Sequence, residues 1–167
     1  MALGPRALSV EHVGSTSIPH MPAKAIIDID VVVADPTDEA SYVSALVGEG
    51  WEEGNTGRGS SGRGAGLQFI LREPDWHQHR FFICDDEGLA AHVHVWGPGC
   101  PEVVRHRIFK EWLLAHPDDF ERYAAVKRES SEASQKGDED MRQYNSRKEP
   151  LIQAILDRAF KAQGLLE

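Results

Sequence analysis

After Lys24, an apolar run extends to Val33 and is broken only by two carboxylates, Asp28 and Asp30. Side chains alternate between the two faces of a strand, so both aspartates project to one side, and Ile27, Ile29, Val31 and Val33 project to the other. The pattern predicts a strand with a core-facing apolar side and a carboxylate side. Like charges next to each other repel. Either water on the exposed side of a sheet or a divalent cation between the carboxylates would relieve that repulsion.

Short alternating segments elsewhere in the chain predict further strands, with turns at residues 74–76 and 85–88. These strands are expected at residues 9–13, 67–72, 79–84 and 91–96. In the last of them Val93 and Val95 share one face, so His92 and His94 share the opposite face.

Helical spacing of apolar residues appears in two regions. A first helix is expected from Thr37 or Asp38 to about Val47, stopped by Gly48 and Gly50. Beyond residues 97–101 the period is helical throughout. One helix ends at His116–Pro117, a second opens at Asp118 or Asp119 and is interrupted at Gly137, and a third closes near Gly164 with a kink or a restart at Pro150.

Strands in the first part of the chain and helices in the last part predict an α+β fold. We expect a mixed β-sheet with helices on one face and a helical C-terminal part. A length of 167 residues suits one domain with a proper core. The prediction is a single domain over residues 1–167, sheet-rich from about 9 to 97 and helical from about 101 to 163.

Composition narrows the class of protein. The net charge of −9 argues against a broad nucleic-acid-binding face, which is usually basic. No apolar run is long enough to span a membrane, and Pro5 and Arg6 interrupt the short apolar start where a signal peptide would lie. Two cysteines, Cys84 and Cys100, do not make a disulfide framework or a paired metal motif. These features predict a cytoplasmic protein that does not bind membranes.

The strand at residues 9–13 leads into a bend that suits phosphate. Gly14 lets the backbone approach a phosphate closely. The hydroxyl groups of Ser15, Thr16 and Ser17, with nearby backbone amides, would then hold phosphate oxygens. A second glycine-rich stretch at residues 54–66 is either a phosphate-gripping loop or a plain hairpin connection, and its glycines do not have the spacing of a P-loop.

Together, Gly-Ser, a short spacer and Asp-x-Asp between apolar residues resemble the pattern of the nucleotidyltransferase superfamily. More narrowly, residues 11–19 (Glu-His-Val-Gly-Ser-Thr-Ser-Ile-Pro) followed by residues 23–30 resemble the GrpB family. The resemblance continues in residues 92–95, in the helix at residues 107–114, and in Tyr144 with Lys148. Domains of that family occur alone or fused to dephospho-CoA kinase. The resemblance to the superfamily implies a nucleotidyltransferase-like fold.

The resemblance also implies site roles. Asp28 and Asp30 would bind Mg²⁺ that bridges a nucleoside triphosphate, and Ser15 would contact the phosphate chain, with Gly14, Thr16 and Lys24 as further phosphate-binding candidates. Active members of the superfamily supply a third carboxylate, and His94 stands in that place here. A histidine can act as a base, but Mg²⁺ prefers oxygen ligands. Whether this chain is an enzyme therefore stays open.

For each further pocket candidate, a structural or surface role is the alternative to ligand binding. His92 and His94 either face a metal or phosphate from one strand face or bond neighbouring groups on a half-buried sheet. Lys24, Arg72 and Arg80 are phosphate partners or solvated charges. His12 lines the pocket or makes a local hydrogen bond. Tyr144 and Lys148, four residues apart on a helix, close the pocket or serve as core and surface residues. His77 and His79 flank a turn and are expected to be exposed.

Two function classes follow, and a third is weaker. The first is an enzyme that moves a nucleotidyl group from a nucleoside triphosphate to an unknown hydroxyl acceptor, with Asp28, Asp30 and His94 as catalytic residues. The second is a module that binds a nucleotide, a coenzyme A precursor or another phosphate ligand without transfer. The third is a transition-metal site for hydrolysis, built from His92, His94 and the two aspartates. In each case the expected partner is a small molecule.

Overall fold

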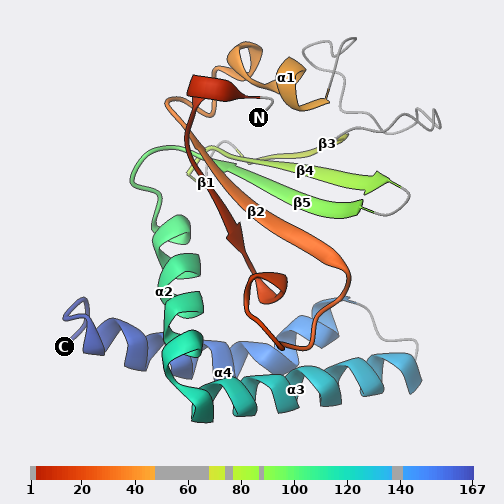
Figure 1. Cartoon of the computed structure of the whole chain (residues 1–167), viewed down its shortest axis with the longest axis vertical. Helices are drawn as coiled ribbons and strands as arrows, with labels where there is room; N and C mark the ends of the chain where they lie inside the picture. The colour runs from red at the N-terminus through yellow and green to blue at the C-terminus, as the bar shows by residue number, and fades with distance from the viewer. Residues whose placement is uncertain (1–2, 48–67, 74–76, 87–88, 137–140) are drawn as a thin grey trace. The chain divides into compact units, whose positions relative to one another are not determined.

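The carboxylate strand expected after Lys24 forms as β2 (Ile26–Val33), within a five-stranded sheet. The other strands are β1 (Ala7–Val13), β3 (Gln68–Glu73), β4 (His79–Asp86) and β5 (Leu89–Trp96). In the order β1-β2-β5-β4-β3, β2 and β5 are parallel and the other neighbours are antiparallel (Figure 1). The predicted mixed sheet and α+β class are therefore confirmed.

The computed structural model describes residues 3–47, 68–73, 77–86, 89–136 and 141–167. It divides into a sheet unit, Met1–Ser17 with Lys24–Val103, and a helical unit, Ile18–Ala23 with Val104–Glu167. The single domain expected from the sequence stays a prediction. The expectations for the turn at residues 74–76, for residues 54–66 and for the breaks at Gly48, Gly50 and Gly137 lie outside the described residues.

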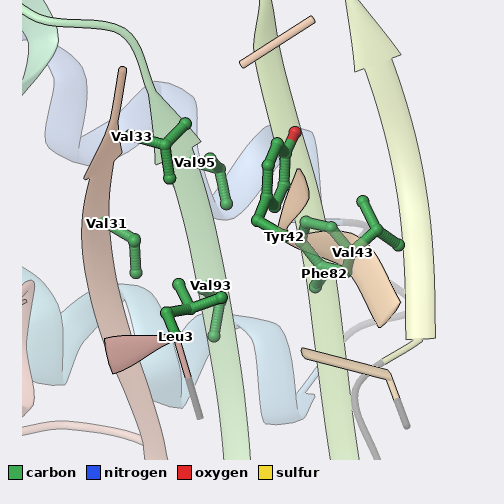
Figure 2. Close-up of a cluster of buried hydrophobic side chains, with 8 residues drawn as sticks. All are labelled: Leu3, Val31, Val33, Tyr42, Val43, Phe82, Val93 and Val95. Carbon is green, nitrogen blue, oxygen red and sulfur yellow. The ribbon is translucent and has the colours of Figure 1, made fainter. Parts of the chain in front are cut away.

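One face of the sheet carries the core of the sheet unit (Figure 2). Alternate valines of β2 and β5 pack there against Phe82 of β4 and against Tyr42 and Val43. Tyr42, Val43, Phe82 and Val95 are completely buried. The core cluster as a whole comprises Leu3, Val31, Val33, Tyr42, Val43, Phe82, Val93 and Val95. This packing fixes which face of β2 and β5 is apolar, and so leaves the aspartates and histidines on the other face.

The helix expected up to Val47 is broken in two. A 3₁₀ helix covers Glu39–Ser41 and the short α1 covers Val43–Val47. Tyr42 lies between them with φ −137°, outside the helical range. Its ring is buried in the core and its hydroxyl donates a 2.7 Å hydrogen bond to the Pro36 carbonyl. Burial of this side chain decides the local backbone, which the apolar spacing alone did not show.

The helical unit contains α2 (Pro101–Ala115) from Val104 onward, together with α3 (Pro117–Lys136) and α4 (Met141–Ala162). Its apolar core comprises Ile18, Met21, Leu113, Tyr123, Ala124 and Ile155. α4 runs through Pro150, so of the two alternatives the restart is wrong, and the kink stays a prediction. The expected end near Gly164 is confirmed: Gly164 has φ +69°, and the Leu165 amide donates to the Phe160 carbonyl.

None of the helices in the described parts of the chain combines the length and the apolar character that a membrane crossing needs.

Candidate functional site

Asp28 and Asp30 lie on one face of β2, as the alternation predicted. In the parallel register Asp28 is the partner of His92 and Asp30 is the partner of His94. Val93, between the two histidines, belongs to the core cluster on the other side of the sheet, and Ile29, between the two aspartates, packs against that cluster. We call the side with Asp28, Asp30, His92 and His94 the carboxylate face. Two segments more than 60 residues apart in the chain thus bring their four polar side chains to one surface of the sheet unit.

Gly14 approaches the carboxylate of Asp28 directly. Gly14 has φ +66°, and a Cβ atom added to it would overlap Asp28 Oδ2. Both facts require glycine at this position, because an L-residue is strained at this φ and the space is already filled. The bend at Gly14 is therefore placed against the exposed end of the carboxylate face, as the sequence motif predicted.

Side-chain hydroxyls stabilise the bend after Gly14, where residues Ser15–Ser17 form a 3₁₀ turn. Ser17 Oγ donates a 2.7 Å hydrogen bond to the Gly14 carbonyl. Thr16 Oγ1 donates to the Ile26 carbonyl at the start of β2 (3.3 Å) and contacts His12 Nε2 at 2.9 Å. For His12 the structure thus shows the local hydrogen bond that was one of its two interpretations. We call residues 14–17 the Gly14 bend.

Asp28 is about one-third exposed, and its Oδ1 lies 3.2 Å from His92 Nδ1. Because a carboxylate accepts, this contact places the proton of His92 on Nδ1. The exposed fraction leaves the Asp28 carboxylate within reach of solvent or a ligand.

Asp30 lies deeper. It is 1% exposed, and its Oδ1 accepts a 2.9 Å hydrogen bond from Trp96 Nε1. His79, 7% exposed, stacks on Trp96 with ring centroids 4.0 Å apart. The Nε2 atom of His79 lies 3.0 Å from His94 Nδ1. The expectation that His79 is exposed is wrong, because β4 begins at this residue and its alternation with Phe81 turns the ring onto the face that carries His94 and Trp96.

Glu11 is a further candidate residue that the sequence interpretation did not name. It is exposed in β1 and is the antiparallel partner of Asp30. Directly paired residues in an antiparallel sheet project to the same side, so Glu11 brings a third carboxylate to the carboxylate face. The sequence offered one signal: Glu11 lies two residues before Val13, so both residues share a face of the strand that leads into Gly14.

Arg80 does not belong to this face. It pairs with Val95 of the core, is 4% exposed, and its Nε donates a 2.6 Å hydrogen bond to buried Glu39 Oε1. The role of Arg80 as a phosphate partner is therefore corrected: its guanidinium holds a buried ion pair on the opposite side of the sheet. The Arg72 side chain lies outside the described part of the chain.

Three other candidates remain predictions. Lys24 is exposed just before β2 in the sheet unit. Tyr144 and Lys148 belong to α4 in the helical unit, so their role at the carboxylate face is untested.

The donor set of the carboxylate face fits a hard cation that arrives with a phosphate ligand. Among the described residues, no three His, Cys, Asp or Glu side chains gather closely enough to hold a metal ion by themselves. Mg²⁺ usually keeps several waters and takes one or two carboxylates plus substrate phosphates, so a complete protein cage is not required. Asp28 offers an exposed carboxylate for this purpose, and Asp30 is the next oxygen donor along the same face. The imidazoles contact Asp28 and His79, an arrangement that favours this donor set over a histidine-rich transition-metal centre.

A mixed sheet with an Asp-x-Asp strand beside a Gly-Ser bend defines an α+β protein with a nucleotidyltransferase-like fold. The family model described as "GrpB protein" matches residues 2–158. The chain therefore belongs to the GrpB family.

The similar proteins agree with this assignment. A UPF0157 protein of Halalkalibacterium halodurans is 37% identical over 94% of this chain and 70% of its own length. The crystal structure of a conserved GrpB protein from Enterococcus faecalis has the same fold, with a TM-score of 0.71 at 24% identity, over 97% of this chain and 86% of that one. A protein named dephospho-CoA kinase from Mycolicibacterium paratuberculosis is 32% identical over 95% of this chain, which spans only 40% of that protein.

Proposed function

We propose that this chain binds a nucleoside triphosphate together with Mg²⁺ on the carboxylate face. The observation that carries the proposal is the approach of Gly14 to the Asp28 carboxylate. It places the backbone amides of a bend beside a partly exposed acid, so phosphate donors and a cation ligand lie together. The nucleotidyltransferase-like fold supports the same choice.

Each part of the face has a distinct task in this proposal. Asp28 contributes the solvent-accessible carboxylate and Asp30 the deeper one, while amides of the Gly14 bend donate hydrogen bonds to phosphate oxygens. When bound, Mg²⁺ would neutralise part of the charge of the phosphate chain. His92, which bonds to Asp28 through Nδ1, holds that carboxylate in one orientation.

Binding without group transfer fits the inner part of the face. His94, in the place of a third carboxylate, contacts His79, whose ring is buried against Trp96. A stacked and hydrogen-bonded imidazole is held as part of the sheet surface. This arrangement supports a binding module in which Asp28 is the accessible acid.

A ligand panel tests the proposal. Thermal unfolding would be followed with ATP, GTP, CTP, UTP and dephospho-CoA, each with and without Mg²⁺ or Mn²⁺, while pyrophosphate release is measured in parallel. We expect stabilisation by at least one nucleotide that requires the metal and disappears in Asp28→Asn. The control, Asp38→Asn, removes an exposed carboxylate of the same unit away from this face and should retain the stabilisation. Equal stabilisation of wild type and Asp28→Asn would contradict the proposal.

Dephospho-CoA belongs in the panel because a similar protein, of which this chain spans only 40%, is named dephospho-CoA kinase. Stabilisation by dephospho-CoA but by none of the four nucleotides would identify a coenzyme A precursor as the ligand and would contradict the nucleoside triphosphate assignment.

Nucleotidyl transfer is a second candidate, and the register of Glu11 with Asp30 favours it, because it supplies a third acid. An acceptor hydroxyl oxygen would attack the α-phosphorus, the bond to the bridging oxygen would break, and pyrophosphate would leave. The hydroxyl proton would pass to Glu11 or His94. We expect pyrophosphate release with a hydroxyl acceptor to disappear in Glu11→Gln while metal-dependent nucleotide binding remains. Release that persists at the wild-type rate in Glu11→Gln would refute this role for Glu11.

A further inference from the structure

A cavity of about 590 Å³ lies at the far end of the sheet unit from the Gly14 bend. Its walls come from the segments that follow β2 and β5 and from the segment that precedes β4. β2 and β5 are the parallel pair of this sheet. In open α/β sheets, ligands bind in the crevice outside the carboxyl ends of parallel strands, and this cavity has the corresponding position at β2 and β5. The volume falls within the range of small-molecule sites.

The walls of the cavity combine one fixed charge with apolar surface. Asp35 is the one acidic residue among the described residues that line the cavity, and it is exposed to solvent. Its Oδ1 accepts hydrogen bonds from the Thr37 hydroxyl (2.6 Å) and the Thr37 amide (2.8 Å). These bonds lower the pKa of Asp35, so the carboxylate is ionised at neutral pH. Burial raises the pKa of the Cys100 thiol, another lining residue, so this thiol adds no charge to the cavity at neutral pH.

The two lining residues before β4 have an unusual backbone conformation. His77 and Gln78, both lining the cavity, have φ +49° and +54°, which non-glycine residues seldom adopt. Arg80 Nη1 donates hydrogen bonds to the carbonyls of Gln78 (2.8 Å) and His79 (3.3 Å), while its Nε holds buried Glu39. Such strain persists only where the surroundings impose it, and it gathers at ligand sites. The buried ion pair thus gives this wall a fixed shape.

The residues that line the cavity favour a small organic ligand over a metal ion. Asp35, His77 and Cys100 all line the cavity, yet no three such side chains in the described part of the chain are close enough to hold a metal ion. From the size, the single fixed carboxylate and the proline-rich walls, we infer that this cavity is a second small-molecule site, which takes an organic amine with a compact apolar body. The ammonium group pairs with Asp35 and the apolar body lies against the exposed ring of Pro98. This site is independent of the carboxylate face and of the function proposed for it.

Binding of benzylamine to the full chain tests the inference, with benzyl alcohol as the uncharged analogue of the same shape. In a titration followed by amide NMR, benzylamine should shift the signals of Gln78 and Gly99 at the cavity, and benzyl alcohol should bind about three- to fivefold more weakly, as expected for loss of an ion pair at an exposed carboxylate. Equal affinity of the two compounds, or no shift of these signals with benzylamine, would overturn the inference. This comparison needs no variant.

A matched pair of variants locates the charge. Asp35→Asn keeps an oxygen that can accept the Thr37 hydrogen bonds but removes the charge, and should weaken benzylamine binding by about three- to fivefold. Asp38→Asn removes an exposed charge three residues away that does not line the cavity, and should change the affinity less than about twofold. An equal loss of benzylamine affinity in both variants would show that the overall negative charge of the surface attracts the amine, and would contradict a specific site. Unchanged affinity in Asp35→Asn would refute the contact with Asp35.

Discussion

The indole of Trp96 donates a 2.9 Å hydrogen bond to the carboxylate of Asp30 across two parallel strands. Trp96 is the register partner of Val32, so its ring extends back along the strand to the acid. Both side chains are almost completely buried. The contact fixes the second aspartate of the Asp-x-Asp motif to β5 and joins it to the stack of His79 and His94.

Replacement of Trp96 by phenylalanine should remove this hydrogen bond while retaining a ring. Hydrogen bonds to charged groups contribute about 1.5–3 kcal/mol, so Trp96→Phe should lower the free energy of unfolding by about that amount in urea titrations. It should also weaken nucleotide-dependent stabilisation. Trp112→Phe is the control, because Trp112 makes an equivalent 2.8 Å bond to Asp119 in the helical unit. If Trp96→Phe and Trp112→Phe lose nucleotide-dependent stabilisation to the same extent, the hydrogen bond to Asp30 has no specific role in binding.

The requirement for glycine at position 14 separates backbone strain from steric overlap. Gly4 and Gly14 both have positive φ, but a Cβ at Gly4 meets nothing within 4 Å, whereas one at Gly14 overlaps Asp28. Gly4→Ala should therefore cost only roughly 1–2 kcal/mol of backbone strain. Gly14→Ala should cost more than Gly4→Ala and should abolish metal-dependent nucleotide stabilisation. Urea unfolding measures the first effect and thermal shift the second; equal behaviour of the two variants would show that the Gly14–Asp28 contact is unimportant.

The buried pair of Arg80 and Glu39 should show strong coupling. Arg80→Met leaves a buried carboxylate without its partner and should destabilise the fold by about 3–5 kcal/mol. The double variant Glu39→Gln/Arg80→Met removes the charge as well and should be less destabilised than Arg80→Met alone. A double-mutant cycle in urea measures the coupling. Additive effects of the two substitutions would contradict the pair.

Asp119 should govern part of the acid sensitivity of the helical unit. Burial raises the pKa of Asp119, but hydrogen bonds from Trp112 and Arg158 outweigh it, and the pKa lies below the ordinary 3.8. The folded state thus binds this proton more weakly than the unfolded state. The resulting stabilisation is complete above the ordinary pKa and is lost as pH falls through the lower folded-state pKa.

Asp119→Asn should therefore lower stability at pH 7 and flatten the loss of stability below about pH 4. Denaturant unfolding as a function of pH measures this slope. Asp118→Asn, at the exposed neighbouring position, should retain the wild-type slope. An unchanged slope in Asp119→Asn would assign the acid sensitivity to other groups.

The alternation of side chains was sufficient to place Asp28 with Asp30, and His92 with His94, because which face a residue takes in a strand depends only on its own segment. The change to helical spacing after residue 101 was likewise local. Other features depend on how distant segments meet. Three contacts show this: the parallel pairing of Asp28 with His92, the stacking of His79 on Trp96, and the ion pair of Arg80 with Glu39. Each joins residues that lie 17 to 64 positions apart, and the sequence does not state the order of the strands that carry them. Register and strand order are chosen by the packing of the whole sheet on its core, so only the tertiary structure decided them.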